Sequence, residues 1–125
     1  MEKNDIFTAV GIVAIFTLVA VVLGVSVFAR VPSYAVKGLV LDKSTADKWF
    51  EMRITEQTKG KTDIRGDRLI IRVLSTTKAY NKSNKEISTA TWLSRVQNDD
   101  TVSVAGEYKS ADGTIWADKL LNRTR

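Results

Sequence analysis

The chain has 125 residues, 44% of them hydrophobic, and its 19 basic and 14 acidic side chains give a net charge of +5. It contains no cysteine and no histidine, which excludes thiol nucleophiles, disulfides, zinc sites built on these residues and catalytic triads that use histidine. The length suits one small domain, but the apolar residues are concentrated near the N-terminus.

The first predicted element is a transmembrane helix over residues 6–29, which follows a short tail of residues 1–5. These 24 residues carry no charge and consist mainly of Val, Ala, Ile, Leu and Phe. A helix of this length extends about 36 Å, enough to cross a hydrocarbon core of about 30 Å. Pro32 prevents a clean continuation of the helix, so residues 30–33 are predicted to form a short linker.

A cleavable signal peptide is the main alternative to a permanent anchor, because Val27-Phe28-Ala29 fits a small-residue cleavage motif. The apolar run is longer than the roughly 7–15 residues typical of a signal peptide. The basic residue before it, Lys3, is also offset by Glu2 and Asp5. We therefore expect a retained signal anchor.

Alternation of apolar and polar residues with a period of two dominates residues 34–125 and predicts a mainly β domain. In the second strand, Phe50, Met52 and Ile54 are expected to face inward. The third strand is nearly all apolar, so it is expected to be buried on both faces and to continue, after a break near Ser75, to Tyr80. The predicted strands are Tyr34–Asp42, Trp49–Glu56, Leu69–Leu74, Thr101–Tyr108 and Thr114–Leu121.

A short helix is predicted between the third and fourth of these strands. Ser88 can cap residues 89–96, in which Trp92, Leu93 and Val96 share one face. Asp112-Gly113 is a hairpin signal between the last two strands. Three strands, a helix and two further strands is the arrangement of the OB-fold, a small Greek-key barrel. The predicted fold is therefore a five-stranded OB-like barrel over residues 34–125, preceded by the transmembrane helix.

Three stretches, Thr77–Tyr80, Asp100–Gly106 and Asp112–Leu120, resemble small bacterial OB-like barrel domains that are often exported or tethered to the membrane. The pattern in that family is G-x-V near the start, T-x-Y midway, then G-D-x-V-x-V-x-G and D-G-x-I-x-A-x-x-I. Gly38-Leu39-Val40 supplies the opening element. The resemblance covers residues 34–122 and implies an OB-like barrel in the cell envelope, without implying an activity.

The chain departs from the family pattern at two places. Asp99 stands where the family has a glycine before the aspartate, and the connection Gln57–Arg68 is unusually long.

Basic residues after the apolar run would place the domain in the cytoplasm under the positive-inside rule, but long translocated domains partly escape that rule. We expect the barrel to be extracytoplasmic. Periplasmic haem chaperones share this layout, but they attach haem through a histidine that this chain lacks.

Trp49, Arg53 and Trp116 are the candidate interaction residues, because strand parity directs them away from the predicted core. Small barrels also bury aromatic residues, which is the structural alternative for both tryptophans. Aromatic residues near cations such as Arg72 and Lys78 are also typical of OB-folds that bind single-stranded nucleic acid.

The sequence predicts no enzyme and no metal or cofactor site. The carboxylate pairs Asp63/Asp67 and Asp99/Asp100 lie in predicted turns, where aspartate commonly binds the backbone, and no complete EF-hand spacing is present. Gly60-Lys61-Thr62 lacks the upstream glycine of a phosphate-binding loop.

The sequence therefore favours a single-pass membrane protein that displays a non-catalytic OB-like domain as an interaction or accessory subunit of a membrane or cell-envelope assembly. Its expected partners are the lipid bilayer and a membrane-proximal protein or a second copy of the chain. The alternative is a membrane-tethered domain that binds nucleic acid through the same outward residues.

Overall fold

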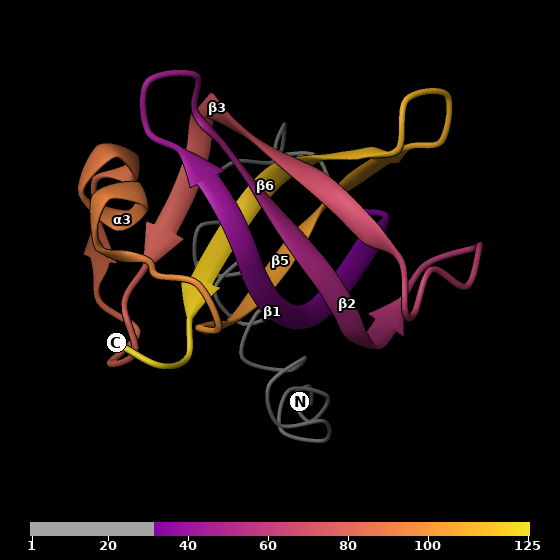
Figure 1. Ribbon diagram of the computed structural model, residues 1–125, viewed down its shortest axis with the longest axis horizontal. Coiled ribbons are helices and arrows are strands. Elements are labelled where there is room, and N and C mark those ends of the chain that lie inside the picture. Colours follow the sequence, from indigo (N-terminus) through magenta and orange to yellow (C-terminus); the bar gives the residue numbers. More distant parts are fainter. Residues whose placement is uncertain (1–31) are drawn as a thin grey trace, which may run out of the picture. The chain divides into compact units, whose positions relative to one another are not determined.

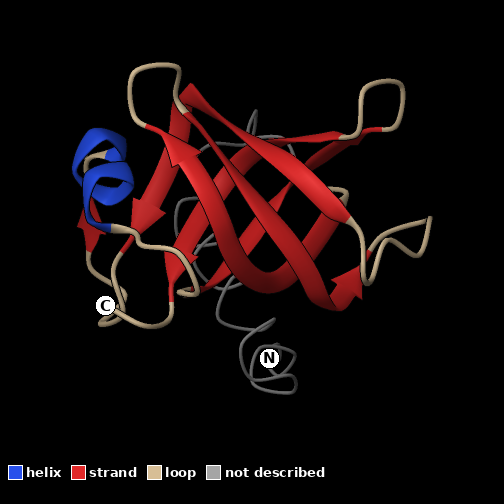
Figure 2. Cartoon of the chain, in the orientation of Figure 1, coloured by secondary structure: helices blue, strands red, loops and turns tan. Residues whose placement is uncertain are grey.

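Five long strands close into a β-barrel in the computed structural model, which describes residues 32–125 (Figures 1 and 2). One short helix precedes the fourth long strand, as the sequence predicts. The transmembrane helix predicted over residues 6–29 lies outside the described residues and stays a prediction. The elements are β1 (Tyr34–Ser44), β2 (Trp49–Lys59), β3 (Arg68–Tyr80), β4 (Glu86–Ile87), α3 (Thr89–Arg95), β5 (Thr101–Lys109) and β6 (Thr114–Asn122).

The long strands form a ring in the order β1–β2–β3–β6–β5, and β5 returns to β1. Every pair in the ring is antiparallel except β3–β6, which is parallel. The short β4 pairs with the end of β3. Closure of the ring pairs each long strand on both sides, which limits the open sheet edges along which chains aggregate. No helix within residues 32–125 is long and apolar enough to cross a membrane.

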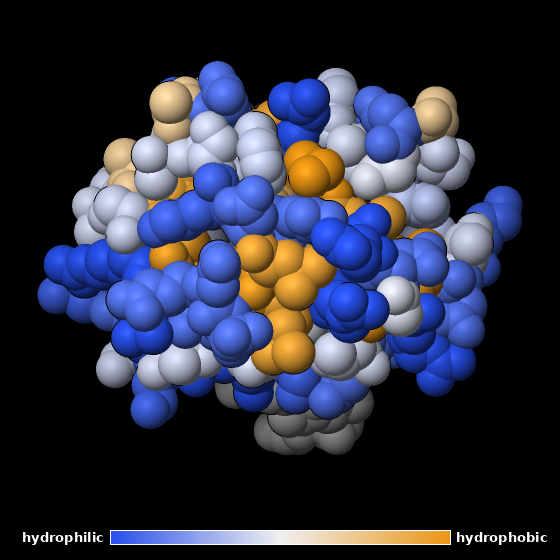
Figure 3. Space-filling model, viewed as in Figure 1, coloured by the Kyte–Doolittle hydropathy of each residue, from blue (hydrophilic) through white to orange (hydrophobic). Residues whose placement is uncertain are grey.

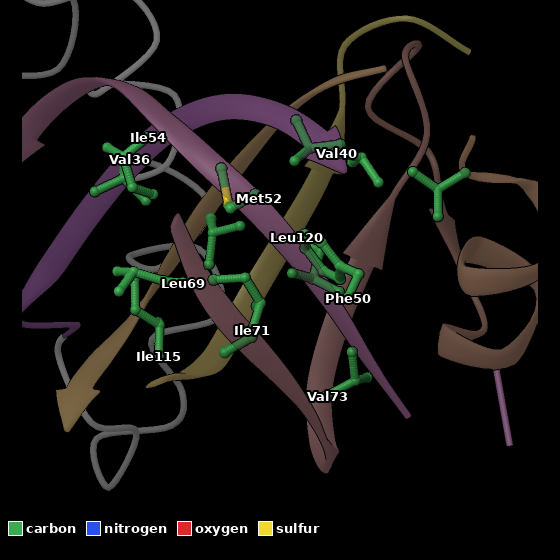
Figure 4. Close-up of a cluster of buried hydrophobic side chains, with 14 of the residues drawn as sticks. Val36, Val40, Phe50, Met52, Ile54, Leu69, Ile71, Val73, Ile115 and Leu120 are labelled. Carbon is green, nitrogen blue, oxygen red and sulfur yellow. The ribbon is translucent and has the colours of Figure 1, made fainter. Parts of the chain in front are cut away.

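The barrel interior is filled by every second side chain of the strands (Figure 4). On β2, Phe50, Met52 and Ile54 are fully buried, so the inward face predicted from the alternation is confirmed. Their neighbours Glu51 and Arg53 point outward, half-buried and exposed respectively. The period-two pattern of this strand therefore corresponds to the inner and outer faces of the barrel wall.

Strand β3 differs from the prediction in its burial. Leu69, Ile71 and Val73 point into the barrel and are buried, whereas Ile70 is half-buried and Arg72 is exposed. The expectation of burial on both faces is wrong, because the wall of the barrel is a single sheet and each strand has only one inner face. The apolar residues on the outer face contribute to the surface instead.

The interruption predicted near Ser75 is an irregularity in the pairing rather than the end of a strand. β3 runs without a break, but its pairing with β6 shifts register after Val73. The Thr77 hydroxyl bridges the irregularity: it accepts a hydrogen bond from the backbone nitrogen of Leu74 at 2.8 Å and donates to the carbonyl of Ala117 at 2.7 Å. Buried backbone groups that lose a strand partner are thereby satisfied.

The two ends of the barrel are closed by different segments. Helix α3 lies at one end, and the connection between β2 and β3 extends from the other (Figure 1). Trp92, Leu93 and Val96 are buried at the helical end, and the connection contributes the buried Ile64. The backbone nitrogen of Ile64 donates to Oε1 of Gln57 at 2.8 Å. The unusual length of this connection is explained by its return to cover the core.

Strand β1 curves strongly around the barrel (Figure 1), and its pairing with β2 shifts register between Lys37 and Gly38. A Cβ atom on Gly38 would collide with the backbone carbonyl of Arg53 on β2. Only glycine allows the two backbones to approach this closely. This contact gives a physical reason for the glycine of the G-x-V motif.

Helix α3 is capped by side chains at both ends. The hydroxyl of Ser88 accepts a hydrogen bond from the backbone nitrogen of Thr91 at 3.1 Å, as predicted for an N-cap. At the other end, the ammonium group of Lys43 on β1 donates to three backbone carbonyls, where a cation is favoured by the helix dipole. The acceptor oxygens and their distances from Nζ are Leu93 (2.7 Å), Ser94 (3.1 Å) and Val96 (2.7 Å).

Replacing Lys43 with methionine is expected to lower the free energy of unfolding by about 1–2 kcal/mol, because it removes hydrogen bonds from a charged donor to these carbonyls. Urea unfolding of the full chain, followed by circular dichroism, measures the change. Lys82→Met is the matched control, since it removes the same charge from an exposed loop and should alter stability by no more than about 0.5 kcal/mol. Equal stability of the two variants would contradict the capping role of Lys43.

Candidate interaction surface

Two tryptophans flank an arginine across three neighbouring strands on the outside of the barrel. Trp49 on β2 pairs with Arg72 on β3, and Arg72 pairs in turn with Trp116 on β6. The residues next to them, Ile71 and Ile115, are fully buried, so the side chains of this row point outward. Adjacent strands lie about 4.8 Å apart, which places the two tryptophan backbones about 10 Å apart. We call Trp49, Arg72 and Trp116 the Trp–Arg–Trp row.

The row combines exposed aromatic surface with positive charge. Trp116 is 37% exposed and is the one large hydrophobic residue that is exposed within residues 32–125. Trp49 is half-buried and Arg72 is exposed. The ammonium of Lys109 lies 4.5 Å from the centroid of the Trp116 ring and also pairs with Glu107 at 3.1 Å. A cation over an indole is attracted by the negative face of the ring.

Arg53 extends this surface along β2. It lies on the same outward face as Trp49, four residues further along the strand, and pairs across the sheet with Leu39 and Arg68. The guanidinium of Arg68 is engaged by Glu51 at 3.3 Å. Arg53 itself is exposed, and neither it nor Arg72 forms an ion pair or side-chain hydrogen bond with any residue of the described barrel.

Apolar surface adjoins these charged groups. Figure 3 shows apolar side chains gathered over the face that carries β1 and β2, with hydrophilic side chains around them. The outward apolar side chains of β1, Leu39 and Leu41, are half-buried. Leu39 is the cross-strand neighbour of Arg53, so an apolar and a basic side chain lie side by side on this part of the wall.

The structure brings two of the three predicted interaction residues into one row and places the third on the same face of β2. The parity of the strands indicated that Trp49, Arg53 and Trp116 point outward. The central position of Arg72 depends on the register of β2 with β3 and of β3 with β6. That register is set by long-range pairing, so sequence reasoning identified Arg72 only as a nearby cation.

One aspartate of each pair, Asp63 and Asp100, has a structural role within the described part of the chain. Asp63 is bound by Arg65 at 2.8 Å, and the hydrogen bonds from that arginine lower the pKa of Asp63 to about 2. Asp99 occupies a turn with a positive φ of 73°, and its neighbour Asp100 is 98% buried, with only 2% of its surface exposed. Among residues 32–125, no three acidic, His or Cys side chains converge to hold a metal ion.

Asp100 anchors the chain that follows β6. Its carboxylate accepts two hydrogen bonds from the guanidinium of Arg125, at 2.8 and 3.0 Å, and one each from the Gln97 backbone nitrogen and the Asn122 side chain. Burial acts to raise the pKa of Asp100, but these hydrogen bonds outweigh it and hold the pKa below its ordinary value. The group therefore stabilises the turn before β5.

Comparison of the chain with known protein families, with curated proteins and with solved structures finds no match.

Proposed function

We propose that this chain is a single-pass membrane-anchored, non-catalytic OB-type domain that binds a partner protein through the Trp–Arg–Trp row. The strand order β1–β2–β3–β6–β5 and the helix between β3 and β5 support the OB-type assignment. The function is that of an interaction or accessory subunit in a membrane or cell-envelope assembly.

The observation that carries the proposal is the placement of Arg72 between Trp49 and Trp116 on the outer wall. Tryptophan and arginine are enriched among the residues that contribute most to protein–protein affinity, because each combines large contact area with a polar group. Arg53, on the same outward face of β2 as Trp49, also adjoins the half-buried Leu39 of β1.

The apolar run of residues 6–29 supports the membrane anchor, and the short predicted linker, residues 30–33, would keep the domain close to the bilayer. We propose that the barrel is extracytoplasmic. Its partner is then a protein, or a second copy of the chain, that lies near the same membrane surface.

Binding of single-stranded nucleic acid is the second candidate, and the same row favours it. Indole rings can stack on bases, and Arg72 could contact a phosphate. The surrounding wall is less suitable for a continuous phosphate backbone, because Glu51 lies between Trp49 and Arg53 on β2 and Glu107 is paired across from Trp116. We therefore rank the protein partner first.

Photo-crosslinking in living cells tests the proposal. A photoreactive phenylalanine analogue in place of Trp116 is expected to give a discrete adduct with a protein, whereas the same group in place of the exposed Ala90 on α3 is expected to give none. Adding Trp49→Ala should weaken the adduct, because removing a central interface tryptophan costs about 2 kcal/mol or more, about 30-fold in affinity.

Two results would overturn the protein-binding proposal: no protein adduct at position 116, or the same adducts at positions 116 and 90. Titration of the full chain with labelled single-stranded DNA and RNA at several salt concentrations tests the second candidate. Steeply salt-dependent binding that is lost in Arg72→Gln would support a nucleic-acid ligand.

A further inference from the structure

Two arginines on the barrel wall are left without acidic partners, although most of the cations around them are paired. Arg53 and Arg72 are both exposed, and neither forms an ion pair within residues 32–125. An exposed cation without a partner is available to an incoming anion. The neighbouring pairs on the wall are Lys37–Glu56, Arg68–Glu51, Lys78–Glu86 and Lys109–Glu107, with nitrogen–oxygen distances of 3.0, 3.3, 3.6 and 3.1 Å.

We infer that the partner presents an extended acidic peptide segment in which two carboxylates, four residues apart, are bound by Arg72 and Arg53. This inference rests on the proposed function and specifies the chemistry of the partner at the same surface. The guanidinium group matches a carboxylate through two parallel hydrogen bonds, which a neutral side chain cannot reproduce.

The spacing of the two arginines sets the spacing of the carboxylates. Arg72 lies directly across from Trp49, and Arg53 lies four residues beyond Trp49 on β2, a distance of about 13 Å along the strand. An extended peptide covers the same distance in four residues, and its side chains at i and i+4 point to the same face. On an α-helix, about 13 Å corresponds to nine residues, whose side chains point to opposite sides.

The groups between the two arginines constrain the middle of the segment. Glu51 lies midway between Trp49 and Arg53 on β2, and Arg68, which is opposite Arg53, reaches diagonally to form an ion pair with Glu51. The residue at i+2 therefore meets a site that is already neutralised. A neutral polar residue fits this position better than a third carboxylate. The same pair disfavours a polyphosphate chain, which carries a negative charge at every repeat.

The tryptophans contribute to the Arg72 end of the site. Trp49 and Trp116 are the cross-strand neighbours of Arg72 on the two adjoining strands, so a segment bound to Arg72 would also cover indole surface and exclude water from the ion pair. Exclusion of water strengthens the attraction between a guanidinium and a carboxylate. The backbones of residues 49–53 and 68–72 are already paired with each other. The segment is therefore bound by side chains rather than by addition of a strand to the sheet.

Selection from a phage-displayed library of random 12-residue peptides, against the full chain in detergent micelles, tests the inference. Selected peptides are expected to share Asp or Glu at positions i and i+4. A synthetic copy of one such peptide should bind the Arg72→Gln and Arg53→Gln variants about tenfold or more weakly than it binds the unaltered chain. Each substitution removes a charged hydrogen-bond donor. Arg95→Gln removes the same charge from the exposed end of α3 and should change the affinity less than about twofold.

The outcomes separate the inference from the proposed function. Selected peptides could require Trp49 and Trp116 yet bind the Arg72→Gln and Arg53→Gln variants with the same affinity as the unaltered chain. In that case the inference of an acidic segment is wrong, while protein binding at the row stands. If no selected peptide depends on either tryptophan, both proposals fail. Enrichment of basic or wholly apolar peptides at the row would also overturn the inference.

Discussion

Replacing Trp92 with alanine is expected to destabilise the barrel by about 3–5 kcal/mol, a large share of the about 5–15 kcal/mol that stabilises a typical domain. Trp92 is 1% exposed, and its ring lies against that of Phe50 with centroids 5.3 Å apart. Its indole nitrogen donates to the carbonyl of Tyr80 at 3.0 Å. Alanine would leave a cavity where α3 covers the core and would remove the donor to that carbonyl. Chemical unfolding of the full chain, followed by circular dichroism, measures the loss.

Two further variants show whether burial is the cause of this effect. Trp92→Phe keeps an aromatic ring against Phe50 but removes the hydrogen bond. Its free energy of unfolding should therefore lie between those of the unaltered chain and Trp92→Ala. Trp116→Ala removes the same side chain from the exposed outer wall and should change stability by about 0.5 kcal/mol or less. If Trp92→Ala and Trp116→Ala were equally stable, the assigned role of Trp92 in closing the barrel would be wrong.

The second large effect is expected at Asp100, where asparagine should lower the free energy of unfolding at pH 7 by about 2–4 kcal/mol. This carboxylate is 2% exposed and accepts hydrogen bonds from Arg125, Gln97 and Asn122. Removing one member of a buried ion pair typically costs about 3–5 kcal/mol. The side chain of Arg125 is 42% exposed, which reduces the effect through solvent screening.

The pH dependence of the Asp100 effect has a definite sign. The pKa of Asp100 is lowered in the folded state, so the unfolded chain binds the proton more tightly. The stabilisation is therefore present above the ordinary aspartate pKa of about 3.9 and is lost as the pH falls through the lower pKa of the folded state. The free energies of unfolding of the unaltered chain and of Asp100→Asn should therefore differ less at pH 3 than at pH 7, as measured by urea unfolding.

Asp99→Asn is the matched control for this prediction. Asp99 is the exposed neighbour of Asp100, and asparagine tolerates its positive φ of 73° as readily as aspartate does. The free energy of unfolding of Asp99→Asn should equal that of the unaltered chain at pH 7 and at pH 3. Asp100→Asn could lower the free energy of unfolding by the same amount at pH 7 and at pH 3. That result would show that the charge of Asp100 is not the source of the effect.

The parts of the fold that follow from local pattern could be predicted from the sequence. The alternation of Phe50, Met52 and Ile54 correctly indicates the inner face of β2, and Ser88 indicates the start of α3. The apolar run of β3 predicts burial on both faces, but Ile70 belongs to the outer wall and is half-buried. Composition cannot distinguish an apolar residue on the outside of a barrel from one between two layers.

Features that depend on contacts between distant residues could not be predicted. Ile64 closes one end of the core, although its neighbours in the sequence are polar or charged. The pairing of Asp100 with Arg125 joins residues 25 positions apart. The Trp–Arg–Trp row likewise requires the parallel register of β3 with β6, because outward parity alone does not determine which outward residues become neighbours.

The parallel contact between β3 and β6 has a consequence for how the protein is made. β6 lies between β3 and β5, so the ring cannot close until β6 has left the ribosome. Non-local pairing of this kind makes folding slow, on the order of milliseconds to seconds. Before that point β1, β2, β3 and β5 can pair only as an open sheet whose apolar inner face is uncovered. The nascent chain is therefore most prone to aggregation just before β6 is synthesised.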